Sequence, residues 1–419
     1  MKRLSIYLLL LVLGWHGAVQ ARLTIEITGG TEGAQPIAVV PFGNPETAVP
    51  SEDVAAVIAA DLARTGRFRP MPRRDMLATP HTAEEVDLRD WRLQSMDNLV
   101  VGQVSNRPAG GYEVSFVLFD VFRGDQLASM SFTSSATELR YTAHRIADVI
   151  YERLTGSPGV FSTRIAYVTS DYSYGSGQRI SLRVSDADGY NPQTIVTSKD
   201  PIMSPAWSPD GRRLAYVSFE NRKTSIFIQE LASGRRERIA SYSGINGAPA
   251  WSPDGRSLAM TLSRDGNPEI YVQDLASREL RRLTDHFGID TEPAFSPDGS
   301  HIVFTSGRGG NPQIYKVPVT GGTPQRVTFE HDYNGRASYA PDGRSLALVT
   351  RVNGRFRIGL LDLGTGVTRL LSDGGLDESP SFAPNGSMVI YATLHNGRGV
   401  LAAVSVDGRG GQRLSQDLG

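Results

Sequence analysis

Four aspartates recur at a regular interval in the second half of the chain: Asp210, Asp254, Asp298 and Asp342. A carboxylate array of this kind could hold a cation or act as acid and base. Each of them, however, lies in a Pro-Asp-Gly turn, where proline presets φ, aspartate bonds the backbone and glycine accepts a positive φ. The sequence therefore assigns these carboxylates to turns.

The other residues that could do chemistry are scattered. The seven histidines are His16, His81, His144, His286, His301, His331 and His395. Their spacing is not that of metal ligands, and no Gly-x-Ser-x-Gly phrase carries a nucleophilic serine. The glycine-rich pieces at 175–177 and 307–310 fit turns better than phosphate loops. We expect no catalytic residue, no metal site and no cofactor, and therefore no enzyme.

The aspartates belong to a longer phrase that is repeated five times. Its copies are Pro205–Gly211, Pro249–Gly255, Pro293–Gly299, Ala337–Gly343 and Pro380–Gly386. The final glycines are 44, 44, 44 and 43 residues apart. A period of this length is typical of a repeat fold.

Each repeat predicts four short strands. The runs Leu258–Leu262 and Ile270–Val272 are almost wholly apolar, as in strands covered on both faces. A sixth copy, residues 165–196, lacks the opening phrase. Six units of about 43 residues favour an all-β, six-bladed β-propeller over residues 160–419. A linear β-solenoid is the alternative, but its repeats are shorter.

The first 21 residues have a different character. Lys2 and Arg3 precede an apolar run and small residues, which predicts a signal peptide cleaved between Ala21 and Arg22. An uncleaved anchor is the alternative, but the run is shorter than the roughly 20 residues that span a bilayer. No other membrane span is expected. The destination is a bacterial periplasm, with the extracellular medium as the alternative.

Composition narrows the function further. The net charge is −1 and no long basic run occurs, which argues against a nucleic-acid partner. The chain contains no cysteine, so it can form no disulfide and carry no lipid attached to cysteine. Strand pairing and packing alone must close the ring.

Residues 22–155 carry no trace of the repeat. Apolar strand patterns alternate with two amphipathic helices, capped by Ser51 and Thr137. This pattern predicts a small N-terminal α+β domain, and residues 156–159, Gly-Ser-Pro-Gly, form a linker to the propeller. The chain is thus expected to be a multidomain protein.

Taken together, these features resemble the TolB family of the Tol-Pal system. Phrases outside the repeat contribute: Pro36–Phe42, Ala59–Leu62, Val100–Val104, Thr163–Val168 and Leu376–Pro380. The resemblance implies a non-enzymatic periplasmic hub, a monomer on its own, that binds the lipoprotein Pal through the propeller and TolA through the mature N-terminus. Other outer-membrane proteins are further expected partners. The implied role is outer-membrane integrity and invagination during cell division.

The expected Pal-binding face lies where the chain enters each Pro-Ala-Trp phrase, because the first strand of a blade is innermost and begins at the channel mouth. The predicted face residues are Met203, Ser204, Asn246, Gly247, Ala248, Asp290, Thr291, Glu292, Asn334, Arg336, Asp377 and Glu378. By resemblance, the positions of Asn246, Thr291 and Glu292 carry the contact, whereas Ile245 replaces a histidine of relatives. Alternatively, these residues only terminate strands.

The expected TolA-binding arm consists of Arg22, Leu23, Thr24, Ile25, Glu26, Ile27 and Thr28. The alternative is an edge strand of the small domain, and both roles can hold together.

Two further expectations concern the ring. Relatives end with another Pro-Ala-Trp-Ser-Pro phrase that closes the first blade, whereas this sequence ends at Gly419. Either the chain is truncated there or residues near 160–163 substitute, and we expect a three-stranded first blade and a weakened closure. The alternative function is an exported propeller hydrolase or lactonase, which would need three or more acids or histidines converging in the channel.

Overall fold

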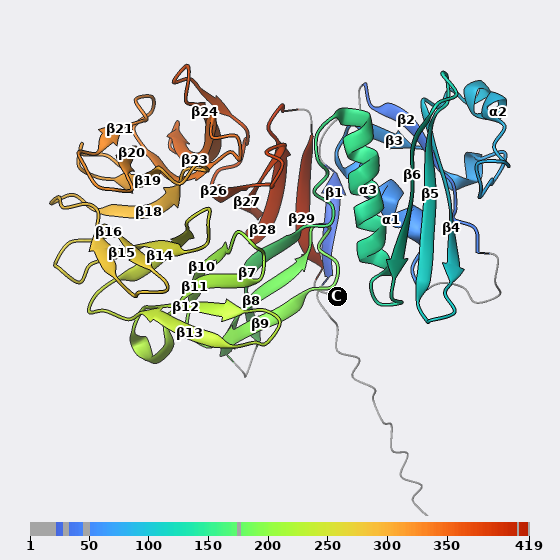
Figure 1. Cartoon of the computed structure of the whole chain (residues 1–419). Helices are drawn as coiled ribbons and strands as arrows, with labels where there is room; N and C mark the ends of the chain where they lie inside the picture. Colours follow the sequence, from blue (N-terminus) through green and yellow to red (C-terminus); the bar gives the residue numbers. More distant parts are fainter. Residues whose placement is uncertain (1–21, 28–32, 45–50, 174–176, 409, 418–419) are drawn as a thin grey trace, which may run out of the picture.

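The computed structural model describes residues 22–27, 33–44, 51–173, 177–408 and 410–417. The predicted signal peptide, its cleavage residue Ala21 and Thr28 lie outside these residues. The chain forms a small domain followed by a six-bladed β-propeller (Figure 1). The fold class predicted from the sequence is confirmed.

The small domain is built on one five-stranded sheet with the order β3-β2-β4-β5-β6. Its strands are β2 (Gln35–Val39), β3 (Phe68–Pro70), β4 (Asn98–Asn106), β5 (Tyr112–Asp120) and β6 (Gln126–Ser134). β2 runs parallel to β3 and β4, and the other pairs are antiparallel. The helices are α1 (Val54–Arg64), α2 (Leu88–Leu93) and α3 (Leu139–Thr155).

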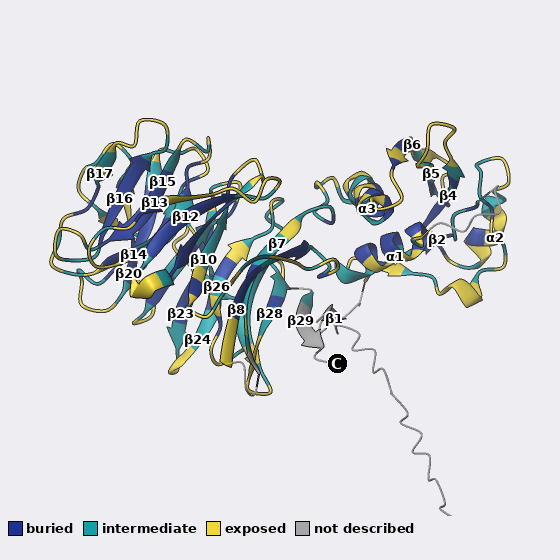
Figure 2. Cartoon of the chain, turned by 90° about the horizontal axis from the view of Figure 1, so that it is seen from below, coloured by how far each residue is buried: buried dark blue, intermediate teal, exposed yellow. Residues whose placement is uncertain are grey.

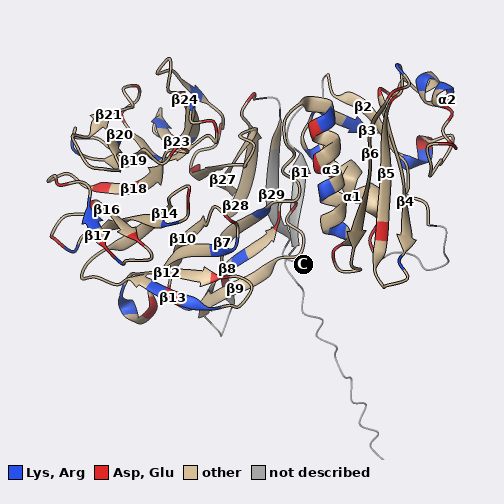
Figure 3. Ribbon diagram, viewed as in Figure 1, with Lys and Arg blue, Asp and Glu red and all other residues tan. Residues whose placement is uncertain are grey.

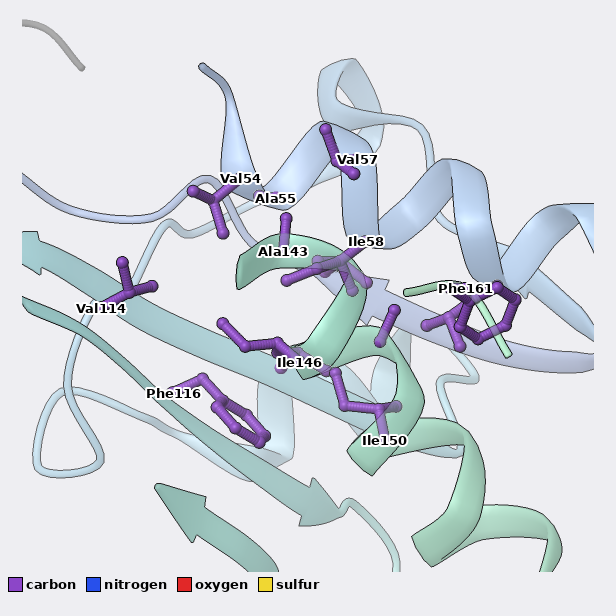
Figure 4. Close-up of a cluster of buried hydrophobic side chains, with 14 of the residues drawn as sticks. Val54, Ala55, Val57, Ile58, Val114, Phe116, Ala143, Ile146, Ile150 and Phe161 are labelled. Atoms are coloured by element: carbon purple, nitrogen blue, oxygen red, sulfur yellow. The ribbon is translucent and has the colours of Figure 1, made fainter. Parts of the chain in front are cut away.

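Strand periodicity distributes the core of this domain over two faces. Successive side chains of a strand point to opposite sides, so Ile37 packs with α1 and α3 while Ala38 packs with Trp91 of α2. Figure 4 shows Ile58 of α1 and Ile146 of α3 in the larger cluster, above the sheet. Both faces of the sheet are thereby covered.

The predicted helices are present, but both begin later than expected. The side chain of Asp53, not Ser51, caps α1 by accepting the N–H of Ala56 at 3.0 Å. The cap residue of α3 is Glu138, whose side chain makes no capping bond. Several polar residues precede each helix, and the sequence pattern does not distinguish which of them adopts the cap position.

The propeller has four regular blades of four antiparallel strands, numbered from the channel outward. The second blade comprises β10 (Ile202–Trp207), β11 (Arg213–Ser218), β12 (Ser225–Glu230) and β13 (Arg236–Ala240). The third comprises β14 (Asn246–Trp251), β15 (Ser257–Leu262), β16 (Glu269–Asp274) and β17 (Leu280–Arg282). The fourth comprises β18 (Asp290–Phe295), β19 (His301–Ser306), β20 (Gln313–Pro318) and β21 (Gln325–Arg326). The fifth comprises β22 (Asn334–Tyr339), β23 (Ser345–Val352), β24 (Arg355–Asp362) and β25 (Thr368–Leu370).

Adjacent blades share their apolar residues. Leu258 and Met260 of β15 pack in one cluster with Ala215 of β11 and Ile228 of β12. Every residue from Leu258 to Leu262 is buried, because neighbouring sheets cover the strand from both sides. Figure 2 shows this burial in the second and third strands, with exposed loops around them.

The first and last blades differ from the others. The first consists of β7 (Arg164–Ser173), β8 (Gly177–Asp186) and β9 (Gln193–Ser198), which is the three-strand arrangement predicted. The last contains β26 (Glu378–Phe382), β27 (Met388–His395), β28 (Arg398–Ser405), β29 (Gly411–Asp417) and, at its edge, β1 (Arg22–Ile27). The expectation that β1 lies at an edge of the small domain is therefore wrong. The antiparallel register with β29, from Arg22 opposite Asp417 to Ile27 opposite Gln412, supplies backbone partners that the sequence alone did not indicate.

Several contacts join the two domains. The Asp148 carboxylate of α3 accepts the N–H groups of Phe161 and Ser162, at 2.7 and 3.2 Å. Arg67 forms an ion pair with Asp407 of the last blade at 3.5 Å. Within the described residues, no helix is both long enough and apolar enough to cross a membrane.

Candidate functional site

The turn end of each inner strand is satisfied by its own polar groups. The hydroxyl of Ser208 donates to Asp210 at 2.5 Å, and the same aspartate accepts the N–H of Arg212 at 3.1 Å. Ser252 with Asp254 and Ser296 with Asp298 repeat this arrangement. These hydroxyl bonds lower the pKa of the three carboxyls, to about 2 for Asp298. The prediction that the aspartates serve turns is confirmed.

The other end of each inner strand, which we call the mouth end, has an irregular backbone. Ser204, Ala248, Glu292, Arg336 and Ser379 occupy equivalent positions and have φ between 47° and 59°. The strand register shifts at each of them. The proline that follows four of these residues disfavours a right-handed helical conformation. A left-handed conformation costs a residue with a side chain about 1 kcal/mol, and such strain often accompanies a functional surface.

This bulge joins neighbouring blades. The N–H of Arg336 donates to the Thr305 hydroxyl of the preceding blade at 2.8 Å, and that hydroxyl donates to Glu292 at 2.9 Å. The N–H of Glu292 in turn donates to Thr261 at 3.3 Å. The left-handed residues thus direct backbone donors sideways, from blade to blade, which fixes the mouth end.

Four of the twelve predicted face residues are buried. Asn246, Asp290, Asn334 and Asp377 are at most 1% exposed. The expectation that their polar groups form part of an exposed ring is wrong. They bond within the chain instead, because a polar side chain that leaves water needs a partner.

Their hydrogen bonds hold the loops of the mouth end. Asp290 accepts from the Ser306 hydroxyl and from Arg308, both at 2.6 Å. Burial raises the pKa of Asp290, although Ser306 and Arg308 oppose this effect. The Asn334 amide donates to the carbonyl of Glu330 at 2.7 Å. The buried residue of each repeat is therefore an anchor.

The remaining predicted face residues are accessible to different degrees. Met203 and Glu378 are exposed. The half-buried residues are Ser204, Gly247, Ala248, Thr291, Glu292 and Arg336. Acidic and basic residues are interspersed along the ribbon of both domains (Figure 3), in keeping with the small net charge.

Several exposed side chains of the mouth end are apolar. Ile245, Ile289 and Leu376 each precede a buried anchor and are 48%, 56% and 47% exposed. Pro201 holds the equivalent position in the second blade and is also exposed. We call these four residues, together with Met203 and Phe287, the apolar collar. Met203 is 50% exposed and Phe287 is 87% exposed.

Of the collar residues, only Met203 was predicted from the sequence to belong to the face. A signal was present, since residues 201, 245 and 289 are apolar and 44 residues apart. It was missed because alternation alone does not decide which of two successive residues points inward. In a strand, a shift of one residue exchanges the buried and exposed sets.

The predicted N-terminal arm lies on the side of the propeller that is turned toward the small domain (Figure 1). Its described residues form β1, which pairs with β29 along its whole length. β1 is the last strand of its sheet, so its other edge has no partner strand among the described residues.

One group of histidine and acidic side chains comes together where the two domains meet. Asp61, His144 and Asp188 have ligand-type atoms within 4.8 Å of one another. Each of the two carboxylates already pairs with an arginine, Arg64 or Arg140. These arginines compensate the negative charge that a cation would need. The group lies between the domains rather than in the propeller channel.

The fold and the mouth end together define a class: a small domain followed by a propeller that presents an apolar, rigidly held surface. Comparison with known proteins makes this specific. The family described as "TolB amino-terminal domain" matches residues 23–127, and "TolB beta propeller domain" matches residues 151–419. The chain belongs to the TolB family of the Tol-Pal system.

Individual relatives agree with this assignment. The chain is 64% identical to the Tol-Pal system protein TolB of Nitrosococcus oceani, over 95% of this chain and 92% of the relative. It is 63% identical to that of Thioalkalivibrio sulfidiphilus, over 94% and 91%. The crystal structure of TolB from Acinetobacter baumannii superposes with a TM-score of 0.87 at 40% identity, over 95% and 97% of the two chains.

Proposed function

We propose that this protein is a non-enzymatic, periplasmic binding hub of the Tol-Pal system, and that the mouth end of its propeller binds Pal. The observation that carries the proposal is the apolar collar. Three of its members, Ile245, Ile289 and Leu376, recur at equivalent positions of different blades, each next to a buried anchor. A group of exposed apolar side chains on a rigid scaffold is typical of a protein-binding surface.

The polar neighbours of the collar suit a protein partner. Thr291, Glu292 and Arg336 lie beside it and are half-buried. Interfaces commonly have an apolar centre with polar groups around it, which fix the orientation of the partner. In this arrangement Ile245 contributes apolar contact where relatives were expected to carry histidine.

A charge placed in the collar tests the proposal. Ile289→Asp should weaken binding of soluble Pal at least about 30-fold, roughly 2 kcal/mol, because an unpaired carboxylate would be desolvated in the interface. Isothermal titration calorimetry with the mature protein measures this. The matched control is Leu93→Asp on the small domain, whose leucine is 84% exposed. Equal Pal affinities of the two variants would contradict the proposal.

We further propose that the N-terminal arm binds TolA as an extended strand. Its backbone is already extended in β1 and has one free edge among the described strands. Addition of a strand to a sheet edge is a common mode of peptide recognition. Such a contact would connect the hub to a second partner, and the two together would support outer-membrane integrity and invagination during cell division.

Deletion of residues 22–27 tests this second contact. TolA binding should fall below detection, whereas Pal affinity should stay within about threefold, since β1 is the outer edge strand of its blade and the collar lies where the inner strands begin. Unchanged TolA affinity would exclude the arm as the site. The hydrolase alternative gains no support, because the acid and histidine group of the described residues lies at the domain junction.

A further inference from the structure

The junction between the domains contains a buried histidine whose two ring nitrogens face two carboxylates. His144 of α3 is 1% exposed. Its Nδ1 lies 2.6 Å from Oδ2 of Asp61 in α1, in the same domain. Its Nε2 lies 3.7 Å from Oδ2 of Asp188, in the turn between β8 and β9 of the propeller. The imidazole therefore stands between the domains.

The geometry distinguishes two protonation states of this ring. Nδ1 donates its proton to Asp61, since a carboxylate can only accept. In the neutral ring, Nε2 would direct a lone pair toward the Asp188 carboxylate, and it has no hydrogen-bond partner within the described residues. In the doubly protonated ring, each nitrogen directs an N–H at a carboxylate. The second state fits both contacts.

Charged groups of the neighbouring elements interact with the ring or with its charged partners. The acidic groups are Glu52, Asp61, Asp148, Asp186 and Asp188, and the basic groups are Arg64, Arg140 and Arg164. Burial alone would raise the pKa of Asp188, but Arg140 and His144 outweigh it and hold that pKa below its usual value. Burial raises the pKa of Asp148 and of Asp186. Acids outnumber arginines, so a positive ring improves the balance of charge.

A small cavity interrupts the packing between the domains. A cavity of about 80 Å³ lies between them, lined by Tyr151 and Phe161 on one side and Met388 on the other. The linker at 156–159 contains two glycines and only one proline. Apolar packing at this junction is therefore incomplete, and polar contacts carry more of the docking.

We propose that His144 is a proton-dependent latch between the two domains: when protonated it bridges Asp61 and Asp188 and holds the small domain on the propeller, and when neutral it releases this contact. This inference concerns the junction and does not depend on the collar or on Pal. A proton that binds the docked arrangement more tightly than the open one strengthens docking as the pH falls. Docking then weakens as the pH rises.

The absence of cysteine makes the distance between the domains measurable. Leu77→Cys in the small domain and Val367→Cys in the propeller replace side chains that are 78% and 57% exposed. Spin labels on this pair report the distance by double electron-electron resonance. Between about pH 5.5 and about pH 8, the ratio of docked to open molecules should fall by up to about tenfold per pH unit, as for one linked proton.

Variants separate the latch from other effects of pH. His144→Gln can still donate to Asp61 but cannot titrate, so the distance distribution should no longer change with pH. His395→Gln, on a propeller hairpin, is the matched control and should respond as the parent does. Should His144→Gln fail to fold, Asp188→Asn keeps the bond to Asp61 and removes the carboxylate that faces Nε2, together with its ion pair to Arg140, and should also abolish the response.

Three results would overturn the proposal. The first is a parent distribution that is the same at both pH values. The second is an unchanged response in His144→Gln or Asp188→Asn. The third is recovery of the docked distance at about pH 8 on adding Zn²⁺, reversed by a chelator, which would make the group a metal site and not a proton site.

Discussion

The two ends of each inner propeller strand are stabilised by different interactions. At the turn end, Ser208, Asp210 and their equivalents bond one another and repeat nearly unchanged from blade to blade. At the mouth end, the side chains vary, the backbone is strained and apolar groups such as Ile245 and Ile289 stay exposed. The most repetitive part of the sequence therefore makes the fold, and the variable part beside it makes the surface.

The comparison also shows how one strand serves both purposes. In β14, Asn246 is buried and bonded at the mouth end, whereas Trp251 bonds to the neighbouring blade at the turn end. Between them lies the left-handed residue Ala248. An anchored strand with a bulge can hold an exposed neighbour such as Ile245 in place.

The largest expected effect concerns the anchors of the mouth end. Asp290→Ala should lower the free energy of unfolding by about 3 kcal/mol, because it leaves Arg308, which is 14% exposed, without its partner in a buried position. Urea denaturation followed by tryptophan fluorescence measures this loss.

The control for this prediction is a turn aspartate. Asp342 is exposed and, among the described residues, accepts one hydrogen bond, from the N–H of Arg344 at 2.9 Å. Asp342→Ala should cost no more than about 0.5 kcal/mol. Equal losses in both variants would remove the distinction between the two ends.

A smaller effect is expected from the staple between blades at the turn end. The Nε1–H of Trp251 donates to the carbonyl of Ala206 at 3.1 Å, and Arg213 lies 4.6 Å from the ring centre. Trp251→Phe should cost about 1 kcal/mol through loss of this bond. Phe295 at the equivalent position shows that a phenyl ring fits. A variant as stable as the parent would show that the bond contributes nothing.

Relief of backbone strain should raise the stability of the protein instead of lowering it. Ala248 has φ of 47°, so Ala248→Gly should leave stability unchanged or raise it by up to about 1 kcal/mol. Ala250→Gly, two residues later in the same strand, should instead lower it by about 0.5 kcal/mol. If both glycines destabilise alike, the bulge carries no strain.

The smallest expected effect is on the stability of the protein at acidic pH. The hydroxyls of Ser296 and Ser300 lower the pKa of Asp298 to about 2, so the stability that this carboxylate contributes is present above about pH 4 and is lost as the pH falls through about 2. Ser296→Ala should flatten the dependence of the melting temperature on pH in this window. Ala340→Ser, which supplies the missing hydroxyl in the fifth blade, should steepen it, and any other order of slopes would contradict the assignment.

Much of the fold could be predicted because the repeated phrase makes the length of each repeat visible in the sequence. The phrase from Pro249 to Gly255 marks a strand and a turn, and its spacing sets the size and number of the blades. The same pattern could not separate Asn246, which is buried, from Ile245, which is exposed. That choice depends on the bulge, which has no period-two signal.

Contacts between segments far apart in the chain could not be predicted from the sequence. β1 pairs with β29, nearly four hundred residues later, and an edge pairing between alternating segments carries no local signature. His144 meets Asp61, 83 residues earlier, and Asp188 of the other domain. As a lone histidine within a helix pattern, it gave no reason to single it out.

The central claim is that partner binding belongs to the mouth end, and hydrogen exchange tests it most directly. Amide exchange of the mature protein should be compared with and without soluble Pal. With Pal bound, we predict slower exchange at 243–248, 287–292 and 374–379, and unchanged exchange in the turns at 208–212, 252–256 and 296–300. Protection of the turns, or of neither set while Pal is bound, would contradict it.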